Sequence, residues 1–104
     1  MKEPNPKCYT IYSKSGCINC VKVKQLLKDN NTIFEVIDCD EYLIENKEEF
    51  LDFMKQLIGY EYRMFPMVFE SGKFIGGFNE TNKYVTDNNK NNNNSKSISF
   101  DSDF

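Results

Sequence analysis

The start of the chain carries the pattern that most constrains its fold: a strand, a glycine turn, a helix and a second strand in direct succession. Cys8–Tyr12 is dense in β-forming residues, and Ser13–Gly16 ends that strand character. From Ile18 to Lys28 the apolar residues recur at helical spacing, which predicts an amphipathic helix. Thr32–Ile37 is again typical of a strand. A β-α-β order within about 30 residues favours a parallel pair joined by a right-handed crossover.

The rest of the domain is predicted to add two helices and a hairpin. Apolar residues on one face predict a single helix from Tyr42 to Ile58, ended by Gly59. The segment Met67–Ile75, with Ser71-Gly72 in its middle, predicts a β-hairpin with a two-residue turn. Asn79–Val85 fits a short final helix. The alternation of strands and helices defines an α/β fold.

The length of the chain, 104 residues, leaves room for one compact domain. We place that domain at residues 7–86, after an N-terminal extension at 1–6. Residues 87–104 begin as an asparagine-rich stretch that is too polar to bury, which predicts a disordered tail. One domain of this size predicts one active site and a monomer.

Charge and composition exclude several classes of protein. A net charge of −3 and a pI near 4.9 provide no cationic surface for nucleic acid. No segment approaches the roughly 20 apolar residues of a membrane span, and none resembles a signal peptide, so we expect a cytoplasmic protein. The chain has no histidine, which removes the usual general base and the usual zinc ligand.

The four cysteines are the remaining candidates for catalytic or metal-binding residues. In a reducing compartment such residues are more often catalytic or metal-binding than structural disulfides. Of the four, only Cys17 and Cys20 have two-residue spacing, and a two-knuckle zinc site would need a second close pair. We therefore predict no bound metal of that kind. Cys8 and Cys39 stand alone in β-like stretches and are expected in the core.

Cys17 is the better candidate for the reactive thiol of the pair. Cysteines act as nucleophiles in the thiolate form, which is favoured at a helix N-terminus or beside a cation. Cys17 lies where the Ile18 helix begins, and Lys14 lies on the same turn. Cys20 falls one turn further in, so we predict that Cys17 attacks and Cys20 resolves. The alternative is that both are small buried hydrophobic residues.

Three segments of the sequence, Tyr12–Cys20, Met64–Phe69 and Gly72–Glu80, resemble the three signature regions of glutaredoxins in order and spacing. The resemblance covers roughly residues 7–86. It implies a thioredoxin-like fold with a four-stranded mixed sheet and flanking helices in the order βαβαββα, and a cis peptide bond before Pro66. It also implies an enzyme, a glutathione-dependent thiol–disulfide oxidoreductase that acts on disulfide-containing proteins or glutathionylated thiols.

The resemblance also implies a set of glutathione contacts. Cationic side chains would hold the glycine carboxylate, the backbone before the cis-proline would pair with the tripeptide, and a helix start would hold the γ-glutamyl end. The residues that match these roles, together with one position between the cysteines, are Lys14, Asn19, Arg63, Phe65, Pro66, Gly77, Asn79 and Glu80. The alternatives are solvated surface charges and glycines that only permit a tight turn.

Some features depart from the family pattern and leave other functions open. Ile18-Asn19 replaces the usual proline and aromatic residue, and Tyr60-Glu61-Tyr62 resembles a small insertion. Glutaredoxins without that proline can hold a [2Fe–2S] cluster between two monomers, so a cluster carrier is the rival interpretation. Ile98–Phe104 resembles the C-terminal docking peptide of the class I ribonucleotide reductase small subunit. The tail would then tether the protein to the reductase large subunit; a pure adaptor and an uninformative tail are the alternatives.

Overall fold

The computed structural model describes the backbone of residues 1–93 and the side chains of residues 1–88. Its centre is a four-stranded sheet in the order β2-β1-β3-β4, built from β1 (Tyr9–Ser13), β2 (Phe34–Asp38), β3 (Met67–Glu70) and β4 (Lys73–Gly76). β1 and β2 are parallel, as the crossover pattern predicts, and the other pairs are antiparallel. The helices are α1 (Ile18–Asp29), α2 (Asp40–Glu45), α3 (Lys47–Ile58) and α4 (Phe78–Asn93).

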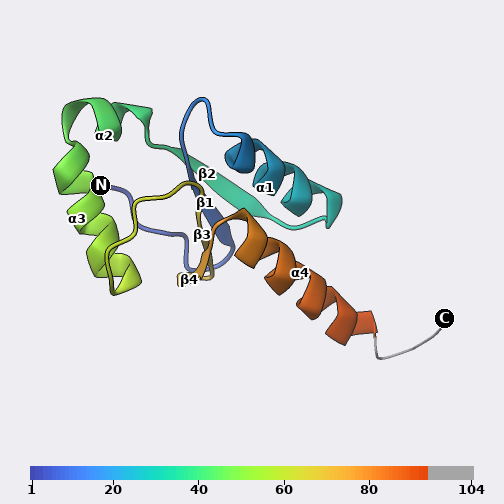
Figure 1. Ribbon diagram of the computed structural model, residues 1–104. Coiled ribbons are helices and arrows are strands. Elements are labelled where there is room, and N and C mark those ends of the chain that lie inside the picture. Colours follow the sequence, from blue (N-terminus) through green and yellow to red (C-terminus); the bar gives the residue numbers. More distant parts are fainter. Residues whose placement is uncertain (94–104) are drawn as a thin grey trace.

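Helices cover both faces of this sheet (Figure 1), with α1 and α4 on one side and α2 and α3 on the other. Successive side chains of each strand point to opposite faces of the sheet, so the apolar residues form one buried layer under each pair of helices. Ile11 and Val68 pack with the α1 residues Val23 and Leu27 and with Val85 of α4. On the other face, a larger apolar cluster joins the strands to α3; its buried members are Tyr12, Ile37, Cys39, Phe50, Leu51, Met54, Met67 and Phe69.

The predicted hairpin is confirmed, and its turn residues explain why it forms. Ser71 and Gly72 both have positive φ, 52° and 86°, and connect β3 directly to β4. Turns with two positive φ values match the right-handed twist of the strands that they connect. The hairpin places β3 beside β1, so the segment that precedes β3 lies close to the end of β1.

The predicted helix from Tyr42 to Ile58 is wrong in one respect, because the structure divides it at Asn46. Asn46 has φ −143° and ψ 50°, outside the helical region, while α2 ends before it and α3 begins after it. Asparagine favours helix ends because its short polar side chain competes for backbone hydrogen bonds. The apolar pattern continues across the break, since Tyr42 still stacks on Phe50 at 5.2 Å between ring centres. α3 ends at Gly59, with φ 100°, as predicted.

The last helix is longer than the sequence predicts. α4 runs from Phe78 to Asn93, whereas the pattern predicted Asn79–Val85 and placed the start of the tail at residue 87. Residues 94–104, including Ile98–Phe104, lie outside the described residues. No helix within residues 1–93 is long and apolar enough to cross a membrane.

Candidate active site

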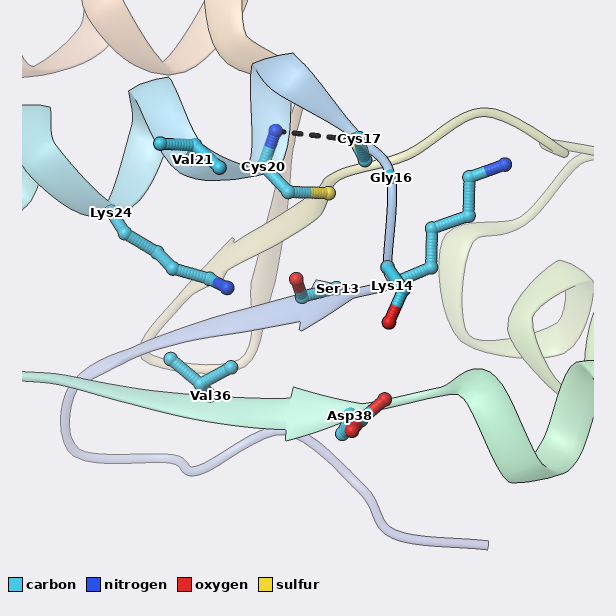
Figure 2. A pocket seen from close by; sticks show the side chains of 10 residues that line it. Ser13, Lys14, Gly16, Cys17, Cys20, Val21, Lys24, Val36 and Asp38 are labelled. Atoms are coloured by element: carbon cyan, nitrogen blue, oxygen red, sulfur yellow. Dashed lines mark hydrogen bonds between the residues drawn. The ribbon is translucent and has the colours of Figure 1, made fainter.

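Cys17 lies at the start of α1, as predicted, and caps that helix with its side chain. Its backbone is extended, with φ −116° and ψ 105°, and its Sγ accepts a hydrogen bond from the Cys20 amide at 3.1 Å (Figure 2). The first-turn amides carry the positive end of the helix dipole, and here they meet a partly exposed sulfur. Cys17 and Cys20 are both free thiols in this structure.

Cys20 has a different environment from Cys17. It is only 1% exposed, and burial raises the pKa of its thiol, as does its hydrogen bond with Cys17. Contacts with the Lys14 backbone and the Ser13 hydroxyl lower the same pKa by less. Of the two thiols, Cys17 is therefore the accessible one, whereas burial favours the protonated form of Cys20.

A cavity of about 300 Å³ opens beside the two cysteines, on the side where α1 faces β2. Val36 and Asp38 of β2 and Lys24 of α1 form part of its lining. In Figure 2 the Lys24 amine extends into this space toward Ser13, whereas the Lys14 side chain leaves on the opposite side. The Lys14 amine therefore lies outside this cavity, although Lys14 contributes to its lining, and none of the other predicted glutathione residues lines it.

A second cavity, of about 240 Å³, brings together several of the predicted ligand residues on the α3 side of the site. Lys14, Arg63 and Phe65 line it, and the Lys14 Nζ lies 5.5 Å from the centre of the Phe65 ring. Lys47 adds a third cation that the sequence analysis missed. Only the helix break at Asn46 makes Lys47 the first residue of a helix, and the sequence pattern did not predict that break. Three cations around one cavity suit a carboxylate ligand.

Arg63 reaches this cavity but is already paired with two carboxylates. Its guanidinium lies 2.6 Å from Glu61 and 3.2 Å from Glu48. The hydrogen bond from Arg63 lowers the pKa of the Glu61 carboxyl, and the contacts with Glu61 and Glu48 raise the pKa of Arg63. Both pairs are exposed to solvent, so they are weak and exchangeable. Glu61 belongs to the insertion noted in the sequence.

The remaining predicted ligand residues meet where α4 begins. The Phe65–Pro66 peptide bond is cis, as the resemblance implied. The Gly77 amide donates to Glu80 Oε1 at 3.0 Å, a helix-start pairing in which a third-position glutamate reaches back to the cap. A methyl group built on Gly77 would lie 3.5 Å from that oxygen, 3.6 Å from the Tyr62 hydroxyl and 3.7 Å from the Pro66 carbonyl. These groups therefore surround the start of α4, where Asn79 is exposed.

Asn19 does not join either group of predicted ligand residues. It is exposed on the first turn of α1, and no hydrogen bond within residues 1–88 ties it to them. Within the same residues no cluster of three or more His, Cys, Asp or Glu side chains could hold a metal ion.

Of the other two cysteines, Cys39 is buried as predicted, and burial raises the pKa of its thiol to about 12. Cys8 is only half-buried, because it precedes β1 rather than lying within it. Neither cysteine lines the cavity beside Cys17.

A mixed four-stranded sheet with helices on both faces, a cis-proline before β3 and a cysteine pair at a helix start define the thioredoxin-like class of α/β proteins. The glutaredoxin family model matches residues 9–75. Human mitochondrial glutaredoxin-2 is 34% identical over 76 residues, which cover 73% of this chain and 44% of the human protein. The orangutan (Pongo abelii) mitochondrial glutaredoxin-2 is also 34% identical, with 73% of this chain and 45% of the relative covered. This chain thus belongs to the glutaredoxin family, although it spans less than half the length of these curated relatives.

Solved structures agree with this placement. Glutaredoxin 1 from Francisella tularensis, complexed with cacodylate, has a TM-score of 0.67 and 32% identity, and the match covers 80% of this chain and 95% of that one. The buckwheat glutaredoxin–glutathione complex has a TM-score of 0.66 and 26% identity, covering 81% of this chain and 73% of that one. The predicted thioredoxin-like fold is confirmed.

Proposed function

We propose that this protein is a glutaredoxin-type thiol–disulfide oxidoreductase that uses glutathione as its reductant. The observation that carries the proposal is the pairing of a partly exposed Cys17 sulfur, held on a first-turn amide, with a buried Cys20 thiol. Family membership supports it, as does the glutathione bound by the buckwheat relative. The curated relatives named above are mitochondrial proteins, so the cytoplasmic location stays a prediction.

The reaction begins when the Cys17 thiolate attacks one sulfur of a disulfide or of a glutathionylated thiol. A bond forms between Cys17 Sγ and that sulfur, the original S–S bond breaks, and the other sulfur leaves as a thiolate. Cys20 then loses its proton and attacks Cys17 Sγ, which releases the bound thiol and leaves a Cys17–Cys20 disulfide. Alternatively, where the mixed disulfide joins Cys17 to glutathione, a free glutathione thiolate attacks the bound glutathione sulfur; glutathione disulfide forms and Cys17 leaves as a thiolate. Two glutathione molecules return an oxidised Cys17–Cys20 pair to the dithiol and are themselves converted to one glutathione disulfide.

Glutathione would span the two groups of ligand residues. Lys14, Lys47 and Arg63 would hold its glycine carboxylate in the cavity beside Phe65. The Phe65 backbone, next to the cis-proline, would pair with the tripeptide in the manner of an added strand. The backbone amides of Asn79 and Glu80, two exposed residues in the first turn of α4, would hold the γ-glutamyl carboxylate. Because Glu80 Oε1 already accepts the Gly77 amide, its other oxygen would meet the ammonium group.

The test is turnover of a glutathionylated peptide by the purified protein with glutathione, glutathione reductase and NADPH. We expect Cys17→Ser to abolish turnover, because the other thiol at a helix start among the described residues, that of Cys39 before α2, is fully buried and its pKa is raised to about 12. Cys20→Ser should retain this reaction and lose only the reduction of protein disulfides. Equal losses in the two variants would contradict the assigned roles, and no turnover by the folded, reduced wild type would contradict the proposed function.

The cluster carrier is the alternative that the Ile18-Asn19 pair keeps open. Since no metal-binding group of three side chains occurs within residues 1–88, a [2Fe–2S] cluster would need one Cys17 from each of two chains plus glutathione. Cys17 is accessible enough for this, and the neighbouring Ile18 is 67% exposed. Protein purified without oxygen would then be a coloured dimer. A colourless monomer would count against cluster carriage.

The ribonucleotide reductase hypothesis rests on the sequence of the tail alone. If Ile98–Phe104 docks on the large subunit, the tail raises the effective concentration of the reductant near its client toward the millimolar range. A synthetic peptide of residues 94–104 should then compete with the small subunit for the large subunit. A peptide that does not compete would remove the hypothesis without affecting the proposed activity.

A further inference from the structure

The loop that leads from β1 to Cys17 is held by Asp40, the first residue of α2. The Ser15 amide donates to Asp40 Oδ1 at 2.8 Å, and the Ser15 hydroxyl donates to Asp40 Oδ2. One carboxylate therefore accepts both the backbone and the side-chain donor of a residue two positions before the nucleophile. This contact joins segments 25 residues apart in sequence.

Asp40 is itself fixed by the end of β2. Its amide donates to Asp38 Oδ1 at 3.0 Å, and the adjacent Cys39 amide donates to the Ser13 carbonyl at 2.8 Å. The hydrogen bonds from Ser15 lower the pKa of the Asp40 carboxyl, and the charge of Lys14 lowers it further, so Asp40 remains an ionised acceptor. The hydrogen bonds of Ser15 with Asp40 thus tether the exposed loop to the end of β2.

Apart from the contact of the Cys20 thiol with the Lys14 backbone and of the Lys14 amine with Phe65, the loop has little packing to restrain it. Lys14, Ser15 and Gly16 are all exposed, and Gly16 has φ +70°, a conformation that glycine adopts without strain. The loop orients Lys14 over Phe65 on one side and leads directly into Cys17 on the other. Movement of the loop would therefore disturb both the sulfur that accepts the Cys20 amide and the cation expected to meet glutathione.

We propose that Asp40 is a positioning residue for the nucleophile: by holding Ser15 it keeps the Cys17 sulfur on the first-turn amide of α1. The charged groups around Cys17 are Lys14 of the loop, Lys24 of α1 and Asp38 of β2, which line the adjoining cavity, together with Asp40 itself. The negative charge of Asp40 alone would disfavour a thiolate nearby. Its charge therefore lowers the reactivity of Cys17, whereas its hydrogen bonds with Ser15 raise it. The expected effect of Asp40 on glutathione-dependent turnover rests on the proposed function, whereas its expected effect on the reactivity of the Cys17 thiol does not.

The experiment compares Asp40→Ala with Asp40→Asn, two variants of equal charge. Asparagine can still accept the Ser15 amide and donate to its hydroxyl, whereas alanine can do neither. The readout is the rate of Cys17 alkylation by iodoacetamide against pH, with the modified cysteine located by mass spectrometry. We expect Asp40→Ala to react roughly three- to fivefold more slowly than Asp40→Asn at pH 7, with its midpoint shifted to higher pH, because the loop loses two exposed hydrogen bonds that are each worth about twofold.

Control variants separate positioning from a general loss of stability. Glu41→Ala removes the next acidic side chain, which is exposed on the same helix, and should leave the alkylation profile unchanged. Ser15→Ala removes only the hydroxyl bond and should slow alkylation about twofold, with no further effect in the Asp40→Ala background. If Asp40→Ala does not fold, the comparison of Ser15→Ala with wild type decides the question.

Identical profiles for Asp40→Ala and Asp40→Asn would overturn the proposal, even if both melt at lower temperature than wild type, as would a Ser15→Ala profile equal to that of wild type. Because alkylation needs no glutathione, the result also separates this inference from the proposed function. A protein that responds as expected in alkylation but shows no turnover would refute the glutathione-dependent activity and leave the role of Asp40 intact.

Discussion

At the scale of single residues, Arg63 already pairs with two acidic side chains in the cavity where we expect it to bind a ligand carboxylate. Glu61 contacts its Nε and Glu48 contacts one terminal nitrogen, while Lys14 and Lys47 of the same cavity have no such partner among the described residues. A ligand carboxylate must therefore compete for Arg63 but not for the two lysines. Because exposed ion pairs are worth only about 0.2–1 kcal/mol, this competition lowers affinity without preventing binding.

We therefore predict that Glu61→Gln lowers the KM for a glutathionylated peptide about twofold and leaves kcat unchanged. The variant also removes one negative charge, which by itself favours an anionic ligand. Glu49→Gln is the matched control, since Glu49 is exposed on α3 and has no ion pair within residues 1–88. Steady-state kinetics of both variants measure the effect. A raised KM in Glu61→Gln would mean instead that Glu61 holds Arg63 in its binding position.

At the scale of elements, Gly76 decides how β4 passes into α4. Its φ is +135°, and a methyl group there would lie 2.7 Å from Glu80 Cβ and 2.8 Å from Glu80 Cγ. These atoms are close to the helix backbone and cannot turn aside as the end of a side chain can. The packing of Glu80 over Gly76 also leaves the Glu80 carboxylate on the Gly77 amide. The glycine thus permits the helix start that we expect to hold the γ-glutamyl end.

We predict that Gly76→Ala destabilises the protein by about 1–3 kcal/mol and raises the KM for glutathionylated substrate, because the first turn of α4 must move. Gly72→Ala is the control: its φ is +86°, but a methyl group there meets nothing within 4 Å. It should cost about 1 kcal/mol and leave KM unchanged. Urea unfolding and steady-state kinetics measure both effects. Equal KM values in the two variants would show that α4 tolerates the displacement.

Comparison of elements also shows what the sequence could predict. β1, α1 and the hairpin were found because strand composition, helical spacing and the Ser71-Gly72 turn are local signals. The break at Asn46 was missed because Tyr42 and Phe50 continue one apolar face across it, and Lys47 was missed with it. The Asp40 contact joins residues 25 positions apart and has no local signal at all. The cis bond before Pro66 came only from the family resemblance, since most X–Pro bonds are trans.

At the scale of the whole molecule, one sheet separates two apolar clusters that share no buried residue. Val23 of α1 lies in the cluster under α1 and α4, and Met54 of α3 lies in the cluster on the other face. Both clusters include residues of β1 and β3, because alternate side chains of each strand point to opposite faces. Loss of the packing on one face therefore removes support for the strands that the other face needs, and the domain should unfold as one unit.

We predict that Val23→Ala and Met54→Ala each lower the free energy of unfolding by roughly 2–4 kcal/mol, since neither side chain is exposed. In both variants the urea transition followed by far-UV circular dichroism should coincide with that followed by tyrosine fluorescence, for which the six tyrosines and the lack of tryptophan make the chain suitable. Tyr12 reports on the α3 face and Tyr9 on the other. Two separated transitions in either variant would mean that the faces unfold independently, and the fixed geometry of Cys17 would then depend on the α1 face alone.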